Sequence, residues 1–192
     1  MNELNDDELA RLARTGLEKC MQRMTEVSPG VWQLAAVRVF CGEVRGAIRG
    51  GEREGKPASA IRIRIKGAIP FITAIIFSPE DIRHISRCFA EEIYFGPVSE
   101  AQPDVTVIEI GNILLNMLVN SLLRGLKKSA VPSVPAHFQG DCGSVEKWLG
   151  AGPGPFTIIS AKFTMQREGS TACAEIFAFL PQQLIEQEPP AP

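Results

Sequence analysis

Apolar and polar residues alternate along the chain in patterns that predict long amphipathic helices separated by strands. Leucine and methionine recur at helical spacing over residues 4–25, and Ser28-Pro29-Gly30 ends that predicted helix. Residues 61–66 alternate between isoleucine and a basic residue, which predicts a strand with one solvated face. The other strands are predicted at 31–44, 71–77, 156–166 and 171–180, and the other helices at 78–92, 104–128 and 181–188.

The order of these elements contains a faint internal repeat. Residues 75–82 and residues 176–184 each predict an apolar strand that ends at a proline-started helix, and each half begins with a long helix followed by strands. Duplicated α-β-β units usually join as one pseudo-symmetric sheet, mixed or antiparallel, with long helices packed on it. We therefore expect an α+β fold. It would be a single domain over 1–188, with halves of about 1–95 and 96–188 and a disordered tail at 189–192.

The predicted helix at 104–128 carries a polar stripe that packing alone does not require. Between residues 107 and 123 nearly every side chain is aliphatic or methionine. Asparagine is a mediocre helix former, and a merely solvated stripe would normally use glutamate, lysine, glutamine or arginine. At about 100° per residue the four stripe residues fall within an arc of roughly 80°, which suits the holding of a small polar ligand or a water. Apart from Gly111 and Ser121, the exceptions to the apolar pattern are Glu109, Asn112, Asn116 and Asn120.

Composition and charge argue against several classes of function. The 192 residues are 45% hydrophobic and 22% charged, which is enough apolar material for one core. The net charge of −2 argues against nucleic-acid binding, because such proteins usually carry a basic excess. The acidic N-terminus is unlike a signal peptide, and the longest apolar stretch contains Glu109 and three asparagines, which argues against a membrane span. A cytoplasmic protein is expected.

Cysteine, histidine and glycine residues give no second candidate site. The five cysteines form no Cys-x-x-Cys motif and only two histidines occur, so no zinc site is expected and the thiols are predicted to be free and buried. His84 is predicted on a helix and His137 in a loop, and neither has a serine or cysteine at a matching spacing. The segment 150–155 lacks the ending of a phosphate-binding loop and is predicted to be a linker.

The acid and the first amide of the stripe form a motif with a proline downstream. Glu109-Ile-Gly-Asn112 resembles the Glu-x-x-Asn signature of the CheC, CheX and FliY phosphatases of bacterial chemotaxis, and Pro135 stands 23 positions after Asn112, as that signature requires. The segments 67–92 and 156–187 also resemble the family's flanking elements, so the likeness covers most of residues 60–187.

The first half of the chain lacks this motif. With Gly16 laid on Gly111, the positions of the acid and the amide hold Arg14 and Leu17. CheC usually carries two motifs, whereas a single motif resembles CheX and implies a homodimer. The alternating strand at 61–66 could then lie at a sheet edge and pair with a second chain.

The resemblance implies an enzyme that hydrolyses the phospho-aspartate of a CheY-type response regulator. The partner would supply the aspartate, the Mg²⁺ ion and a lysine, so no cofactor is expected on this chain. Asn112 would position the attacking water, because an amide can accept one hydrogen from water and donate to phosphoryl oxygens without adding negative charge. Glu109 would pair with the partner's lysine. Asn116 and Asn120 would bond neighbouring backbone or line the groove edge, with Asn116 and Pro135 as the candidate supporting residues.

Alternatives to hydrolysis stay open at this point. Val105 stands where the family often has aspartate or serine, and Asp104, one position away, is given no catalytic role. A second hypothesis is therefore a non-catalytic module that docks a phosphorylated regulator or a CheD-type partner. A third is a structural part of the flagellar switch, as with FliY. The circuit would be chemotaxis or another two-component pathway.

Overall fold

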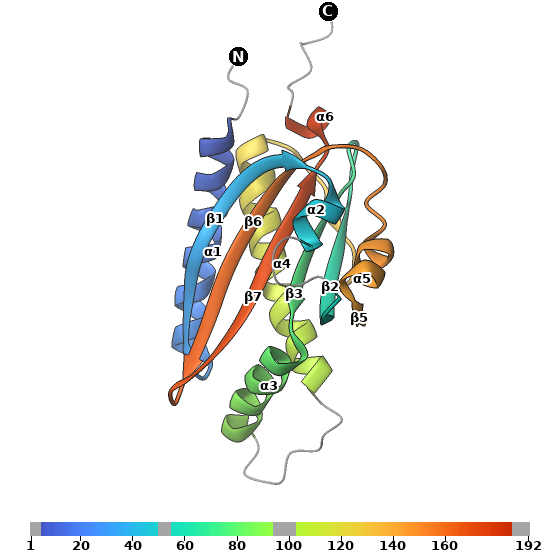
Figure 1. The fold of residues 1–192 in the computed structure, drawn as a ribbon. Coiled ribbons are helices and arrows are strands. Elements are labelled where there is room, and N and C mark those ends of the chain that lie inside the picture. Colours follow the sequence, from blue (N-terminus) through green and yellow to red (C-terminus); the bar gives the residue numbers. More distant parts are fainter. Residues whose placement is uncertain (1–4, 50–54, 94–102, 186–192) are drawn as a thin grey trace, which may run out of the picture.

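The computed structural model describes residues 5–49, 55–93 and 103–185, and these form one antiparallel sheet with helices on both faces (Figure 1). The order of strands across the sheet is β1-β6-β7-β3-β2-β4, and β5 also pairs with β2. The predicted α+β class with a single sheet is confirmed, and every strand pair is antiparallel. The predicted tail at 189–192 lies outside the described residues.

The helices and strands follow the predicted order, with four short additions. The helices are α1 (Asp6–Val27), α2 (Val44–Arg49), α3 (Pro79–Ile93), α4 (Pro103–Leu126), α5 (Cys142–Leu149) and α6 (Gln182–Ile185). The strands are β1 (Val31–Gly42), β2 (Pro57–Lys66), β3 (Phe71–Phe77), β4 (Val131–Pro132), β5 (Ala136–Asp141), β6 (Phe156–Arg167) and β7 (Ser170–Leu180). The elements α2, α5, β4 and β5 were not predicted from the sequence.

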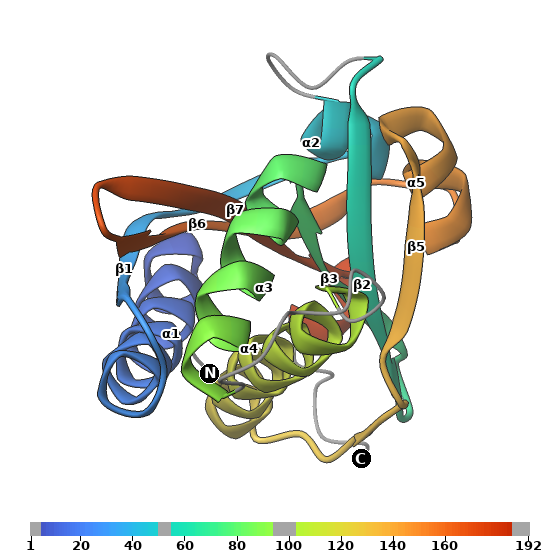
Figure 2. The same cartoon turned by 90° about the horizontal axis from the view of Figure 1, so that it is seen from below.

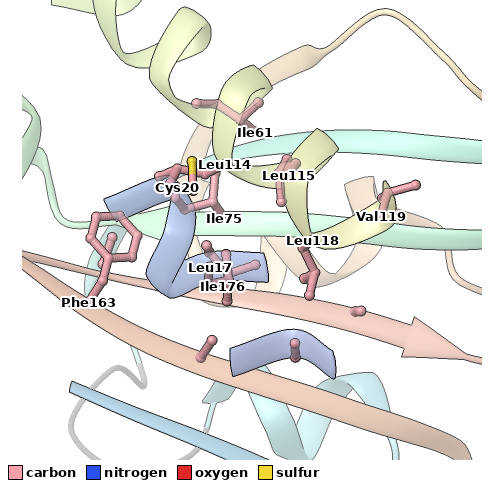
Figure 3. Close-up of a cluster of buried hydrophobic side chains, with 14 of the residues drawn as sticks. Leu17, Cys20, Ile61, Ile75, Leu114, Leu115, Leu118, Val119, Phe163 and Ile176 are labelled. Carbon is pink, nitrogen blue, oxygen red and sulfur yellow. The ribbon is translucent and has the colours of Figure 1, made fainter. Parts of the chain in front are cut away.

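The two faces of the sheet carry separate apolar cores. Helices α1, α3 and α4 cover one face, and the short helices α2 and α5 cover part of the other (Figures 1 and 2). In the larger core the leucines of α4 meet side chains from α1 and from the sheet (Figure 3). Leu114, Leu115 and Leu118 are completely buried there, and burying such a side chain contributes about 1.5–3 kcal/mol.

Helix α4 approaches its neighbours closely at small residues. A Cβ atom added to Gly111 would lie 2.6 Å from Cδ1 of Ile61 on β2, so glycine allows the helix to sit directly on the strand. On the side facing α1, a Cβ added to Gly16 would lie 2.7 Å from Cβ of Ser121, and the Ser121 hydroxyl donates to the Leu12 carbonyl at 2.6 Å. Gly16 therefore packs against a helix and Gly111 against a strand. The alignment of Gly16 with Gly111 between the two halves is not matched by their packing.

Helix α4 is also long and apolar enough to cross a membrane by length and composition, over Val105–Leu126. In this fold it is the central helix of the larger core, and its leucines are buried against the sheet and against α1 and α3. The core helices of soluble proteins pass the same test.

Strand β2 lies inside the sheet, and its predicted place at an edge is wrong. It pairs with β3 on one side and with β4 and β5 on the other. Its polar face is also partly covered: Arg62 donates to the carbonyls of Trp148 and Leu149 at the end of α5, and its guanidinium lies 4.2 Å from the centroid of the Trp148 ring. The arginine therefore joins α5 to the sheet. Strand β1 lies at one edge of the sheet, and β4 and β5 lie at the other.

Among the described residues, one buried hydroxyl in the larger core has no hydrogen-bond partner. Thr73 on β3 is fully buried, and its Oγ1 has no partner within the part of the chain that the structure describes. It lies between Phe71 and Ile75 on the face covered by the long helices. An unsatisfied buried hydroxyl destabilises the folded state, because it loses its hydrogen bonds to water without replacement.

Replacing this threonine by valine should therefore stabilise the protein. We expect Thr73→Val to raise the free energy of unfolding by about 1 kcal/mol, because valine keeps the shape and removes the unpaired hydroxyl. Urea denaturation measures the change. Thr73→Ser, which keeps the hydroxyl and loses a methyl group, is the matched control and should lower stability. A valine variant less stable than the wild type would show that the hydroxyl has a partner.

Candidate functional site

The polar stripe of α4 lies on the outside of the molecule. Glu109 and Asn120 are exposed, and Asn112 and Asn116 are half-buried, whereas the leucines on the opposite side of the helix are fully buried. The acid and the first amide are three residues apart, so they are neighbours on one helical face. The structure thus brings together, on an accessible ridge, the two residues that the motif singled out.

The carboxylate of Glu109 is unengaged by the rest of the described chain. Within residues 5–49, 55–93 and 103–185 it has no hydrogen bond and no ion pair. Its neighbours one turn away on either side are Val105 and Ile113, whose exposed fractions are 60% and 45%. An available carboxylate between two exposed apolar side chains is suited to contact with another protein.

The amide of Asn112 is held by a second amide on the same helix. Nδ2 of Asn116 donates to the backbone carbonyl of Asn112 at 2.8 Å and to Oδ1 of Asn112 at 2.7 Å. The expected bond from Asn116 to neighbouring backbone is therefore present, and the bond to the side chain is additional. Among the described residues, Nδ2 of Asn112 donates to no protein atom, so the donor end of this amide is available.

Pro135 leads into β5, the strand that pairs with β2 beside Ile61. Residue 135 immediately precedes β5, and β5 pairs with β2 so that His137 is opposite Ile61, the residue that lies under Gly111. Ser121 faces α1, and Asn112 stands nine residues before it on the same helix. Nine residues are about two and a half turns, so Asn112 projects from the side of α4 opposite α1. Strand β5 extends the sheet on that side (Figure 2). Pro135 is half-buried and directly precedes this strand, and its supporting role at the motif stays a prediction.

Both histidines have a nearby partner, which their sequence spacing did not reveal. His137 lies on β5 and not in a loop, and its Nε2 is 2.6 Å from Oγ of Ser59, while Nε2 of His84 is 3.8 Å from Sγ of Cys88 within α3. Ser59 and Cys88 are buried, with exposed fractions of 2% and 4%, so neither presents an accessible nucleophile. These pairs are best understood as structural contacts.

The prediction that all five cysteines are buried is only partly correct. Cys20, Cys88 and Cys142 are buried, but Cys41 and Cys173 are exposed, and all five are free. Burial raises the pKa of Cys20 to about 11, an effect that the nearby Arg23 partly opposes, so this thiol is not reactive near neutral pH. The sequence suggested burial from apolar neighbours, but in β1 and β7 such neighbours alternate between the two faces of the sheet.

The stripe is a ridge on a helix and not a hollow. A pocket of about 370 Å³ lies elsewhere, with Asp81, Lys162 and Cys173 among its lining residues, and no stripe residue lines it. Among the described residues no group of three or more histidine, cysteine, aspartate or glutamate side chains could hold a metal ion. A protruding ridge complements a ligand that has a pocket of its own, such as another protein.

No family model matches this sequence, and no curated protein matches it. Solved structures do match its fold. FliY from Thermotoga maritima has a TM-score of 0.69 at 9% identity, with 96% of this chain and 93% of that chain covered. CheX from Borrelia burgdorferi, solved in a CheX-CheY-BeF3-Mg complex, has a TM-score of 0.54 at 13% identity, with 88% and 95% covered. CheX from Desulfovibrio desulfuricans has a TM-score of 0.52 at 12% identity, with 88% and 97% covered. The chain therefore has the fold of the CheX and FliY chemotaxis proteins.

Proposed function

We propose that this protein is a phosphatase that removes the phosphoryl group from the phospho-aspartate of a CheY-type response regulator, in chemotaxis or a related two-component pathway. The observation that carries the proposal is the outward ridge of α4. There, among the residues that the structure describes, the carboxylate of Glu109 has no ion pair, and the amide nitrogen of Asn112, one turn away, donates to no protein atom. The fold shared with CheX and FliY supports it, and one of those CheX proteins was solved in complex with CheY.

In the proposed reaction a water molecule attacks phosphorus. Its oxygen forms the new P–O bond while the bond from phosphorus to the aspartyl oxygen breaks, which gives inorganic phosphate and a free aspartate carboxylate. Oδ1 of Asn112 keeps one lone pair after accepting from Asn116, and this lone pair can accept a hydrogen of the water. Nδ2 can donate to a phosphoryl oxygen. Holding the water in line in this way lowers the entropic part of the barrier.

Glu109 has a different role in the proposal. A carboxylate aimed at a phosphoryl group would be repelled, so docking suits it better than chemistry. It would pair with a lysine of the regulator, and the exposed Val105 and Ile113 would contact the surrounding surface. This pairing sets the position of Asn112, one turn away, relative to phosphorus.

The Mg²⁺ ion required for this chemistry would be bound by the regulator, and the proposal assigns no metal ligand to this chain. Binding of a CheD-type partner, assembly as a homodimer and location in the cytoplasm stay predictions that follow from the resemblance to CheC and CheX.

A second candidate is a binding module that docks the phosphorylated regulator without hydrolysing it. The exposed, apolar Val105 favours it, because the family often has aspartate or serine at that position. Mixing the protein with a CheY-type regulator, Mg²⁺ and acetyl phosphate separates the two candidates. Faster loss of phosphorylation supports the phosphatase, and a stable complex with an unchanged decay rate supports the binder.

Loss of the Asn112 amide should remove most of the protein's acceleration of regulator dephosphorylation. We expect Asn112→Ala to lower the dephosphorylation rate by about 10- to 1,000-fold, because the water is no longer positioned. Decay of the phosphorylated regulator measures this, and circular dichroism checks the fold. Asn120→Ala is the matched control, since it removes the same group from the same stripe about 12 Å further along the helix, and it should retain the wild-type rate. Equal rates for wild type and Asn112→Ala would contradict the assignment.

Loss of the Glu109 carboxylate should act mainly on binding. We expect Glu109→Ala to raise KM for the phosphorylated regulator by about tenfold, and to lower kcat by no more than that, because docking is weakened before the chemical step. Steady-state kinetics over a range of regulator concentrations separate the two constants. Glu18→Ala, which removes an exposed carboxylate from α1, controls for the change in net charge. A large fall in kcat with KM unchanged would assign Glu109 to the chemistry instead.

A further inference from the structure

We propose that Asn116 is a positioning residue that sets which end of the Asn112 amide faces the partner. The inference rests on the proposed phosphatase function and adds a third residue to its site. Asn116 would not touch the phosphoryl group; it would act through its two hydrogen bonds to Asn112.

Both hydrogens of the Asn116 amide are donated to Asn112. An asparagine NH₂ group has two hydrogens. Nδ2 of Asn116 lies 2.8 Å from the backbone oxygen of Asn112 and 2.7 Å from its Oδ1, so each hydrogen has an acceptor. The backbone bond holds the Asn116 side chain along the helix, and the second bond then holds the Asn112 side chain. Both side chains are half-buried, which limits competition from water.

This arrangement decides the orientation of the Asn112 amide. The terminal torsion of asparagine is broad and roughly two-fold, so an isolated side chain would exchange its oxygen and nitrogen between two positions. Beside Asn116 the exchanged form would place two NH₂ groups against each other, with no acceptor between them. Oδ1 of Asn112 is therefore held toward Asn116, and Nδ2 is turned away from it.

The orientation matters because the two ends of the amide do opposite things to a phosphoryl dianion. With Nδ2 outward, Asn112 offers a donor to phosphoryl oxygens and keeps a lone pair of Oδ1 for water. With the amide reversed, its oxygen would meet the phosphoryl oxygens and repel them. A fixed orientation also removes an entropic cost from the reaction, since the amide need not be ordered when the partner binds.

Three variants at residue 116 test the role of its NH₂ donor. Asn116→Asp replaces the donor with an acceptor of the same shape, so Asn112 should turn its own NH₂ toward the new carboxylate. Asn116→Leu removes the donor without adding charge. Asn116→Gln keeps an NH₂ group on a longer arm and serves as the conservative variant. Asn120→Asp adds the same charge one turn further along the stripe and controls for repulsion of the phosphoryl group.

We expect Asn116→Asp to lower kcat by about tenfold or more, with KM for the phosphorylated regulator changed less than twofold. Asn116→Leu should lower kcat by roughly three- to tenfold, because the amide then samples both orientations. Asn116→Gln should recover part of the loss, and Asn120→Asp should leave kcat unchanged. If kcat in both Asn116→Asp and Asn116→Leu stays within about twofold of the wild type, the positioning role is refuted.

A second measurement reports the orientation without activity. In the ¹⁵N–¹H spectrum of the free wild-type protein, both side-chain NH₂ protons of Asn116 should exchange slowly with water and those of Asn112 quickly. In Asn116→Asp the protons of Asn112 should become protected. Fast exchange of the Asn116 protons in the wild type would overturn the proposal.

The two proposals can fail separately. If the wild type does not accelerate dephosphorylation, the phosphatase proposal is wrong and the positioning role falls with it, whatever the spectra show. If the wild type is active and Asn112→Ala is inactive, but Asn116→Asp keeps its kcat, only the positioning role is wrong.

Discussion

Helix α4 is held against β2 at the point where Gly111 leaves room for Ile61. An added Cβ there would lie 2.6 Å from Cδ1 of the isoleucine, so the helix cannot take this position with any larger residue unless Ile61 moves. The contact fixes the rotation of α4 about its axis, together with the fully buried leucines on the same side. Because the rotation is fixed, Glu109 and Asn112 must project outward. The site therefore depends on a packing constraint on the far side of its own helix.

This constraint explains how a mostly apolar helix can carry a polar function. Its apolar majority stabilises the core, and the narrow remaining arc holds the acid and the amides. Of these, the asparagines are the weaker helix formers. One amide, Asn116, is committed to bonds within the helix, while the carboxylate of Glu109 and the donor of Asn112 are available to another molecule. In the proposed reaction the ridge supplies only a docking carboxylate and a positioning amide, and the regulator would supply the reactive group and its pocket.

The sequence patterns predicted the long elements correctly. Helices α1, α3 and α4 are long enough to show a helical apolar period, and strands β1, β2, β3, β6 and β7 contain apolar alternation or apolar runs. The short helices α2 and α5 span too few turns to show a period. The place of β2 in the sheet depends on β5, a mixed polar strand about 75 residues later, which no local pattern links to it. The stripe predicted which face of α4 would be polar, but the direction of the bond from Asn116 to Asn112 depends on rotamers that spacing does not encode.

A double-mutant cycle at the contact between Gly111 and Ile61 tests the central claim most directly. Gly111→Ala should lower the free energy of unfolding by about 1–3 kcal/mol, although alanine is the better helix former by about 1 kcal/mol, and should slow dephosphorylation because α4 is displaced. Adding Ile61→Val, which removes the contacting Cδ1 atom, should restore part of both losses. An alanine variant as stable and as active as the wild type, or a double variant with strictly additive losses, would contradict the account.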